Sequence, residues 1–158
     1  MERIFNTNDY NQLITQFYFS IRDGLSSAFP KIDMGDYVML HVIAHLAGQQ
    51  EAETDRVYVK QLSEYLEMTV AEGAALARAL SERGLVEWTH DPENLSAGAY
   101  VKISEYGQEL LQDQSDSLKE TIQYVRDQIG MEKLMMLLQT SMEIRNLLKL
   151  KNVSAADA

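Results

Sequence analysis

The chain has 158 residues, of which 46% are hydrophobic and 24% charged, a composition typical of one globular domain with its own core. Fourteen Lys and Arg residues against 24 Asp and Glu residues give a net charge of −10, and cysteine is absent. This composition excludes disulfides, thiolate metal ligands and thiol catalysis, and the charge opposes polyanions unless cations gather locally.

The first third of the chain predicts two helices. Apolar residues at intervals of three and four predict a helix over 8–28, which ends before Pro30. A second helix over 34–47 begins after Asp33, a good N-terminal cap, and stops at Gly48. Because this second helix is apolar almost all round, we expect it to lie at the centre of the fold.

The middle of the chain predicts short elements in a mixed order. They are a very short strand over 57–59, a helix over 60–67, a helix over 69–82 and two strands over 85–90 and 99–104. Thr69 and Glu72 fit a capping box at the start of the second of these helices. Pro92 and Gly98 place a turn or hairpin loop between the two strands.

Two long helices complete the prediction. Ser104 caps a helix that runs to Ile129, and Gly130 separates it from a last helix over 131–150. We expect residues 152–158 to be a disordered tail. The residues of the last helix expected to be buried are Met131, Leu134, Met135, Leu138, Met142 and Leu148.

This order predicts a mainly α fold with a small β-hairpin wing, in which two short helices and a hairpin form a winged helix-turn-helix. We expect a single domain over 1–158, with a winged lobe over 57–104. The helices over 8–47 and 105–150 would dimerise the chain, because the first and last helices carry apolar stripes that need a partner.

Four stretches resemble the MarR family of bacterial transcription regulators in their order and spacing. They are VKQLSEYL at 59–66, LSERGLVE at 80–87, DPEN at 91–94 and ISEYGQELL at 103–111. The resemblance implies a triangular homodimer joined by its terminal helices, with helix 69–82 in a major groove of DNA and the wing over 91–98 near a minor groove. It also implies tuning by small phenolic or other ligands bound between the dimer region and the lobes.

The lobe departs from the family pattern where the family contacts DNA. Recognition helices of the family usually carry Ser, Thr and Arg or Lys, whereas residues 69–75 read TVAEGAA and the wing tip at 94–97 reads NLSA. Residues 57–104 hold four Lys and Arg against seven Asp and Glu, a net charge of −3. We therefore expect weak DNA binding. The alternative is a chain that has lost DNA binding and acts as a dimeric protein-interaction or ligand-sensing module.

Two sets of residues are candidates for binding. Aromatic residues at helical spacing could line a ligand pocket, although core or dimer packing is the simpler interpretation. The pocket candidates are Tyr10, Phe17, Tyr18, Tyr37 and Tyr106. The DNA candidates are Lys60, Thr69, Arg78, Arg83, His90 and Lys102.

Metal binding and catalysis have little support. His41 and His45 lie four residues apart on one helix and could share a metal, but two ligands alone do not make a site. Neither a nucleophile–histidine motif nor a Gly-rich phosphate loop is present, so we expect no enzyme activity and no cofactor. The expected partners are a second copy, DNA bound weakly, another protein or a small aromatic ligand. No apolar run approaches the roughly 18 residues of a membrane span, so we expect a cytoplasmic protein.

Overall fold

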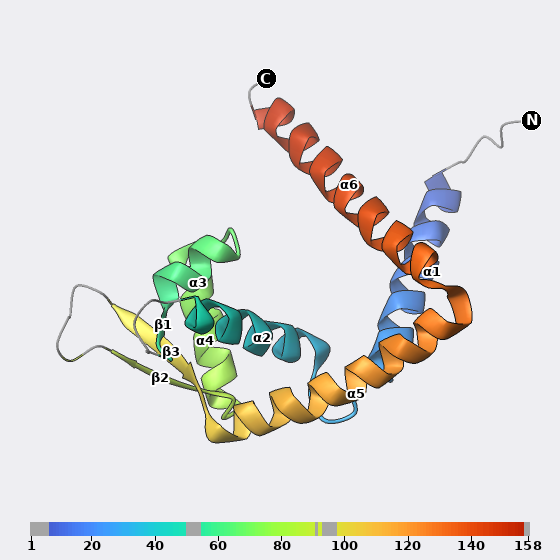
Figure 1. Cartoon of the computed structure of the whole chain (residues 1–158). Helices are drawn as coiled ribbons and strands as arrows, with labels where there is room; N and C mark the ends of the chain where they lie inside the picture. Colours follow the sequence, from blue (N-terminus) through green and yellow to red (C-terminus); the bar gives the residue numbers. More distant parts are fainter. Residues whose placement is uncertain (1–6, 50–54, 91, 93–97, 157–158) are drawn as a thin grey trace, which may run out of the picture. The chain divides into compact units, whose positions relative to one another are not determined.

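A computed structural model describes residues 7–49, 55–90, 92 and 98–156, with the backbone alone at 7–10, 21, 25 and 153–156. The chain divides into two compact units, residues 1–117 and 118–158, and helix α5 crosses the boundary (Figure 1). The elements are α1 Thr7–Ser26, α2 Met34–Gly48, β1 Val57–Tyr58, α3 Val59–Tyr65, α4 Val70–Glu82, β2 Val86–His90, β3 Ala99–Ile103, α5 Glu105–Ile129 and α6 Met131–Ala156.

The first unit contains a winged helix-turn-helix, which confirms the predicted fold class. Three antiparallel strands lie in the order β1-β3-β2, so the long hairpin strands pair with each other and β2 is an edge strand. Helices α3 and α4 precede the hairpin and pack on one another. The fully buried apolar side chains come from α2, the sheet and both short helices: Leu40, Ile43, Val57, Leu62, Ala77, Leu80 and Val101.

Two glycines permit close approaches inside this lobe. A Cβ atom on Gly73 of α4 would lie 2.0 Å from Oγ of Ser63, whose buried hydroxyl donates to the carbonyl of Val59 at 2.7 Å. A Cβ atom on Gly107 of α5 would lie 2.2 Å from the carbonyl oxygen of Leu85. Because both approaches are shorter than any normal contact, glycine is required where α4 crosses α3 and where α5 leaves the lobe.

The helix boundaries follow the capping signals in the sequence. The Asp33 side chain accepts from the backbone N–H of Gly35 at 2.8 Å, and Ser104 Oγ accepts from that of Gly107 at 2.9 Å. At the other end of α5, Gly130 has a φ of 88°, a left-handed conformation that suits glycine, and α6 begins at the next residue. The prediction of a disordered tail from residue 152 is wrong as far as residue 156, because α6 continues through it.

The start of α5 is fastened to the segment between α1 and α2. The buried side-chain amide of Gln114 donates to the carbonyl of Ala28, and Lys31 pairs with Asp113 at 2.7 Å. The hydroxyl groups of Tyr37 and Ser115 lie 3.1 Å apart. These contacts fix the first turns of α5 against α2 and the segment that precedes it.

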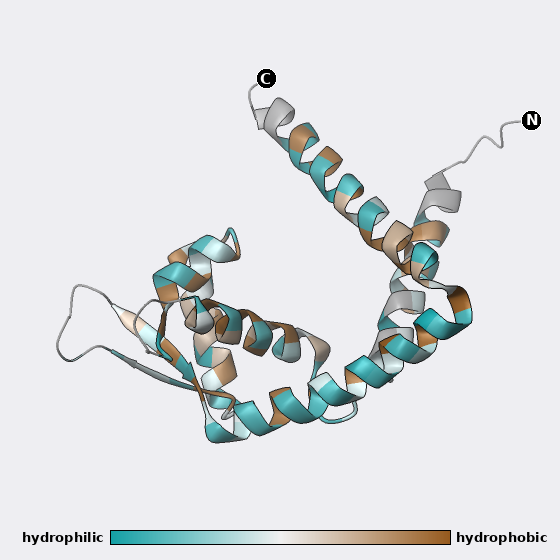
Figure 2. Ribbon diagram, viewed as in Figure 1, coloured by the Kyte–Doolittle hydropathy of each residue, from teal (hydrophilic) through white to brown (hydrophobic). Residues whose placement is uncertain are grey.

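Two helical regions, one in each unit, keep apolar side chains in water. In α1 the exposed apolar residues include Leu13, Ile14 and Phe17, all more than half exposed. In the second unit they extend along α6, where the residues exposed by 45–66% are Met131, Met135, Met136, Leu137, Leu138, Met142, Ile144, Leu147, Leu148 and Leu150. Figure 2 shows hydrophobic residues recurring along α6. The burial predicted for α6 is therefore not supplied by the single chain. No described helix is both long and apolar enough to span a bilayer.

Candidate nucleic-acid interface and ligand cavity

The N-terminus of α4 is closed by its own capping box. Thr69 Oγ1 accepts from the backbone N–H of Glu72 at 3.2 Å and donates to the Glu72 carboxylate at 2.7 Å. The backbone N–H of Thr69 donates to the same carboxylate at 2.8 Å. These hydrogen bonds, the Thr69 hydroxyl first, hold the pKa of Glu72 below its usual value. The Thr69 hydroxyl is therefore engaged within the helix terminus, next to an ionised carboxylate.

Two lobe cations are held by carboxylates along the chain. Lys102 of β3 pairs with Asp55 at 2.9 Å, and this hydrogen bond lowers the pKa of Asp55 and raises that of Lys102. Lys60 of α3 lies 3.9 Å from Glu64 on the next turn. Each pair cancels charge locally, so neither lysine offers its full charge to a phosphate.

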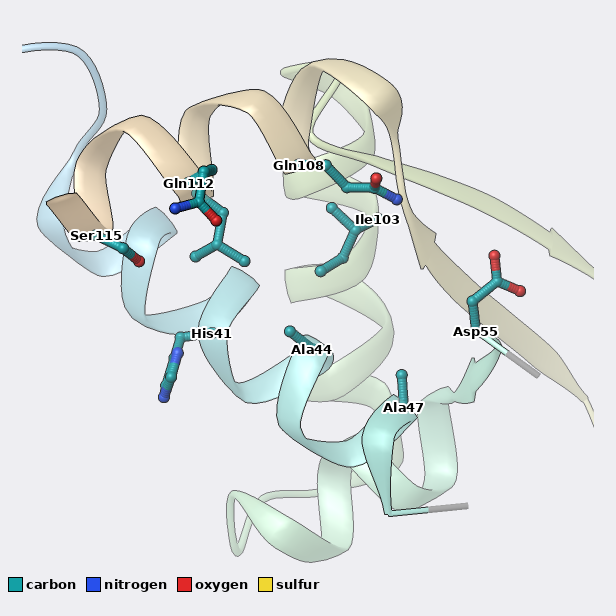
Figure 3. A pocket seen from close by; sticks show the side chains of 9 residues that line it. His41, Ala44, Ala47, Asp55, Ile103, Gln108, Gln112 and Ser115 are labelled. Atoms are coloured by element: carbon teal, nitrogen blue, oxygen red, sulfur yellow. The ribbon is translucent and has the colours of Figure 1, made fainter. Parts of the chain in front are cut away.

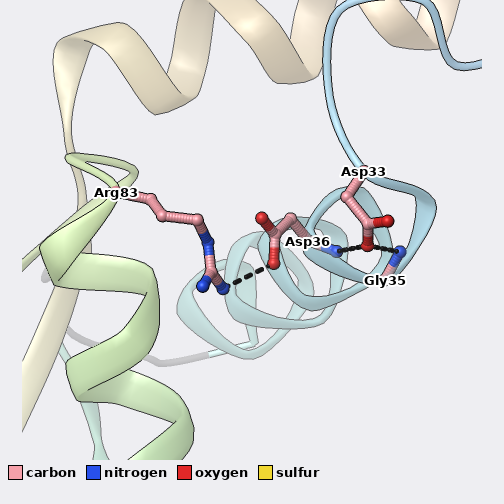
Figure 4. A network of polar contacts seen from close by, with 4 residues as sticks. All are labelled: Asp33, Gly35, Asp36 and Arg83. Atoms are coloured by element: carbon pink, nitrogen blue, oxygen red, sulfur yellow. Dashed lines mark hydrogen bonds and ion pairs between the residues drawn. The ribbon is translucent and has the colours of Figure 1, made fainter.

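A third cation, Arg83, points back to α2 (Figure 4). Its guanidinium donates to Asp36 at 2.7 Å, and the Asp36 side chain is only 16% exposed. The same turn of α2 is capped by Asp33, which accepts from Gly35 and, at 3.4 Å, from the backbone N–H of Asp36. Arg83 therefore ties the end of α4 to the start of α2.

The fourth cation, Arg78, lies over the wing. Its guanidinium carbon is 5.1 Å from the centre of the Trp88 ring, a cation–π contact. Arg78, Ser81 and Glu82 from α4, with Trp88 and His90 from β2, line an open groove of about 300 Å³. Within the described ranges, Arg78 forms no ion pair with a carboxylate and the buried indole N–H of Trp88 has no acceptor.

The structure brings together two of the six DNA candidates, Arg78 and His90. Thr69, Lys60, Arg83 and Lys102 lie apart, each with an intramolecular partner. Sequence reasoning did not assign the acids Asp36 and Asp55, because nothing local marks a carboxylate that pairs 47 residues away. For Trp88 it offered only packing within the lobe or an exposed contact, although its spacing of two from His90 on one strand places both on one face.

A cavity of about 410 Å³ lies between α2, β3 and the first turns of α5 (Figure 3). Its apolar wall consists of small and aliphatic side chains, whereas amide, hydroxyl, imidazole and carboxylate groups supply the polar positions. The lining residues are His41, Ala44, Ala47, Asp55, Ile103, Gln108, Leu111, Gln112 and Ser115. Neither lysine nor arginine is among them, so this cavity favours a neutral ligand or a cation over a free carboxylate.

The predicted aromatic pocket is dispersed among the described residues. Phe17 and Tyr18 border an apolar depression of about 440 Å³ beside Met34, but Tyr37 is buried elsewhere against Ser115. Tyr106 is 54% exposed on the first turn of α5. The side chain of Tyr10 lies outside the described residues. The described members of this candidate set therefore do not line a common cavity.

The two histidines of α2 have separate neighbours. The His41 ring stacks on Tyr37 with 6.5 Å between centres, whereas His45 lies 6.0 Å from the Tyr65 ring and accepts a hydrogen bond from the Gln49 amide at 2.9 Å. In the part of the chain that the structure describes, no three His, Asp or Glu side chains converge as metal ligands. A metal site at this pair stays without support.

Comparison with known proteins confirms the fold. No protein-family model and no curated protein matches the chain. Solved structures do match, among them AbsC, a MarR family transcriptional regulator from Streptomyces coelicolor (TM-score 0.57, 16% identity, 94% of this chain and 99% of that one). A mutant MarR from E. coli complexed with operator DNA gives 0.63 and 14%, covering 85% and 91%. Bordetella bronchiseptica BpsR, whose DNA binding is regulated by 6-hydroxynicotinic acid, gives 0.64 and 12%, covering 91% and 98%. The chain thus has a MarR-like winged-helix fold.

Proposed function

We propose that the chain is a homodimeric, MarR-like bacterial transcription regulator whose winged lobe binds double-stranded DNA weakly. The observation that carries this proposal is the state of the lobe cations. Three of the four Lys and Arg residues between 57 and 104, namely Lys60, Arg83 and Lys102, are paired with carboxylates of the same chain. DNA affinity depends on neutralising phosphates, and a cation already paired must lose one anion to gain another.

The recognition helix supports the same conclusion. Its exposed positions include Ala71 and Ala75, which have no donor or acceptor for a base edge, and Glu72, which repels phosphate. The fold is nevertheless one that is solved elsewhere with operator DNA bound. We therefore infer a regulator that contacts DNA through few phosphates and with little base readout.

Dimerisation is supported by the exposed apolar faces of α1 and α6. So many exposed apolar side chains on a helix such as α6 are unusual for a lone chain in water and mark an interface. A second copy supplies an equivalent apolar face by symmetry, which makes a two-fold dimer the simplest partner. Light scattering is expected to give twice the 18.0 kDa of one chain.

The direct test is fluorescence anisotropy of a labelled random duplex at about 50 mM and about 200 mM salt. With one or two phosphate contacts, we expect affinity to fall only about 3- to 12-fold between the two concentrations. Nanomolar affinity at physiological salt would contradict the weak-binding proposal. Absence of binding at the lower salt would favour a chain that has lost DNA contact.

A gain-of-function variant tests whether α4 faces DNA. Ala75→Arg places a new guanidinium on its exposed side and should tighten duplex binding about 3- to 10-fold at low salt. The matched control is Gln139→Arg on α6, which adds the same charge outside the lobe. Equal effects of the two variants would mean that net charge, and not the recognition helix, controls binding.

A ligand-sensing role is the second candidate, and the cavity beside α2 and α5 favours it. A ligand there would touch α2, β3 and α5 together, and so would couple the wing strand to the helix that leaves the lobe. Thermal shift should show stabilisation by neutral aromatic amides in preference to aromatic acids, because the lining lacks lysine and arginine. Ala44→Leu should abolish that shift by filling the cavity, whereas Ala75→Leu on the exposed side of α4 should not. A response to neither ligand class would contradict this role.

A further inference from the structure

We propose that the groove between the C-terminal half of α4 and the edge strand β2 is an oxyanion site that receives a backbone phosphate of DNA. Arg78 is its charged donor and the indole N–H of Trp88 is its neutral donor. The inference rests on the proposed function, and it locates the phosphate contact away from both the N-terminus of α4 and the wing tip.

The geometry of the two elements forms the groove. Residues 78, 81 and 82 follow one another at helical spacing on α4, and residues 88 and 90 share one face of β2. Strand β2 is the edge of the sheet, so its outer side has no neighbouring strand. The Arg78 guanidinium carbon is held 5.1 Å from the centre of the Trp88 ring by a cation–π contact. A guanidinium held in this way keeps its N–H edge available for a bidentate acceptor.

The hydrogen-bond donors in the groove lack acceptors among the described residues. Buried N–H groups in folded proteins nearly always have a partner, yet the Trp88 N–H has none among the described atoms. Arg78 differs from Lys60, Arg83 and Lys102 because no described carboxylate pairs with it. Arg78 and Trp88 therefore line one groove and carry two donors without described acceptors. A phosphate oxygen reaches the buried Trp88 N–H only when the indole ring moves, and the emission of Trp88 would report such a movement.

The same groove sets limits on its ligand. Glu82 lines it as well, so a small free anion gains little from Arg78 after repulsion by this carboxylate. A phosphate within a DNA backbone is different, because other contacts along the duplex hold it in place. The groove is open to solvent on the helix that would face DNA, and it has room for such a diester. The shared chemistry is a phosphate oxyanion, and the two sources are separated by experiment.

Trp88 provides the readout, since it is the single tryptophan of the chain. Its emission should change saturably when the full-length protein is titrated with unlabelled duplex at about 50 mM salt. The midpoint should match that of anisotropy measured on a labelled duplex of the same sequence. Inorganic phosphate at equal ionic strength is the second arm and should leave the emission unchanged.

Substitutions separate this groove from general electrostatics. Arg78→Gln should weaken duplex binding about 3- to 10-fold and reduce the salt slope by about one. Trp88→Phe keeps an aromatic ring beneath Arg78 but removes the indole N–H, and should weaken binding by about half the Arg78→Gln effect on a logarithmic scale. The matched control is Lys31→Gln, which removes one cation outside the lobe and should change affinity less than about twofold. Urea unfolding of each variant establishes that it is folded.

Each outcome decides between the site and the wider function. Duplex binding without any change in Trp88 emission, or an Arg78→Gln effect equal to that of Lys31→Gln, would overturn the site and leave a DNA-binding regulator. A response of Trp88 to inorganic phosphate with no binding of duplex would overturn the proposed function and leave an oxyanion groove. If neither duplex nor inorganic phosphate binds, both the oxyanion site and the proposed DNA-binding function are overturned.

Discussion

The winged lobe and helix α6 differ in how they meet water. The lobe and α2 share a closed apolar core, in which Leu40, Leu80 and Val101 are fully buried, and most lobe cations pair with acids of the same chain. Helix α6 leaves its leucines and methionines exposed along its length. The difference teaches that the lobe and α2 form a closed core within one chain, whereas the apolar side chains of α6 are left for the second chain that the proposed dimer would supply.

The largest expected effect comes from placing charge on the apolar side of α6. Leu138→Glu combined with Met142→Glu should convert the dimer to a monomer, because two carboxylates one turn apart would be buried unpaired in the interface. Light scattering should then report the mass of one 18.0 kDa chain. Gln139→Glu on the same helix is the control and should remain dimeric. A wild-type protein that is monomeric at high concentration would contradict dimerisation through α6.

The lobe should be most sensitive at its closest backbone approach. Gly107→Ala would drive a methyl group into the Leu85 carbonyl, which as backbone cannot rotate away. We expect the free energy of unfolding to fall by about 3 kcal/mol in a urea titration. Gly48→Ala, where nothing lies within 4 Å of the new Cβ, should change it by less than about 0.5 kcal/mol. Equal effects would mean that the lobe is less tightly packed than α5 and Leu85 indicate.

A smaller loss is expected when the tie between α4 and α2 is broken. Asp36→Asn removes the charge that Arg83 contacts at 2.7 Å and should cost about 1 kcal/mol, since water screens the half-exposed guanidinium. Asp23→Asn, which breaks the exposed pair with Arg22 on α1, should cost less than Asp36→Asn. A double-mutant cycle with Arg83→Gln would show whether the loss belongs to the pair.

The capping box should give a comparable or smaller change that depends on pH. Thr69→Ala should destabilise the lobe by about 1 kcal/mol at pH 7, and Thr69→Ser, which keeps the hydroxyl, should restore most of it. Because the pKa of Glu72 is lowered on folding, its contribution is present above the usual glutamate value of about 4.3 and disappears as the pH falls through the lowered value. The gap between wild type and Thr69→Ala should therefore narrow in acid. A gap that stays constant to low pH would contradict this.

The fold could be predicted from the sequence because its signals are local. Asp33, the Thr69–Glu72 pair and Ser104 cap helices through residues within three positions, and each does so in the structure. The end of α6 could not be predicted in this way, because the stretch after residue 151 contains no helix stop signal. The helix ends at Ala156.

The candidate site was less predictable for a physical reason. A sequence shows which residues are cations but not which acids they will pair with. Arg83 and Lys102 meet Asp36 and Asp55 only once the chain is folded. The same holds for the aromatic residues, because the buried Tyr37 contacts Ser115 whereas Tyr106 is exposed on α5. Periodicity locates a face of a helix, but it does not say which faces meet.

The glycine that separates α5 from α6, Gly130, is a position at which most substitutions are expected to be harmful. With a φ of 88° at Gly130 and no intervening loop, any mutation to a β-branched residue would strain the only joint between two helices of the second unit. Lineages carrying this gene are therefore expected to retain glycine at that joint.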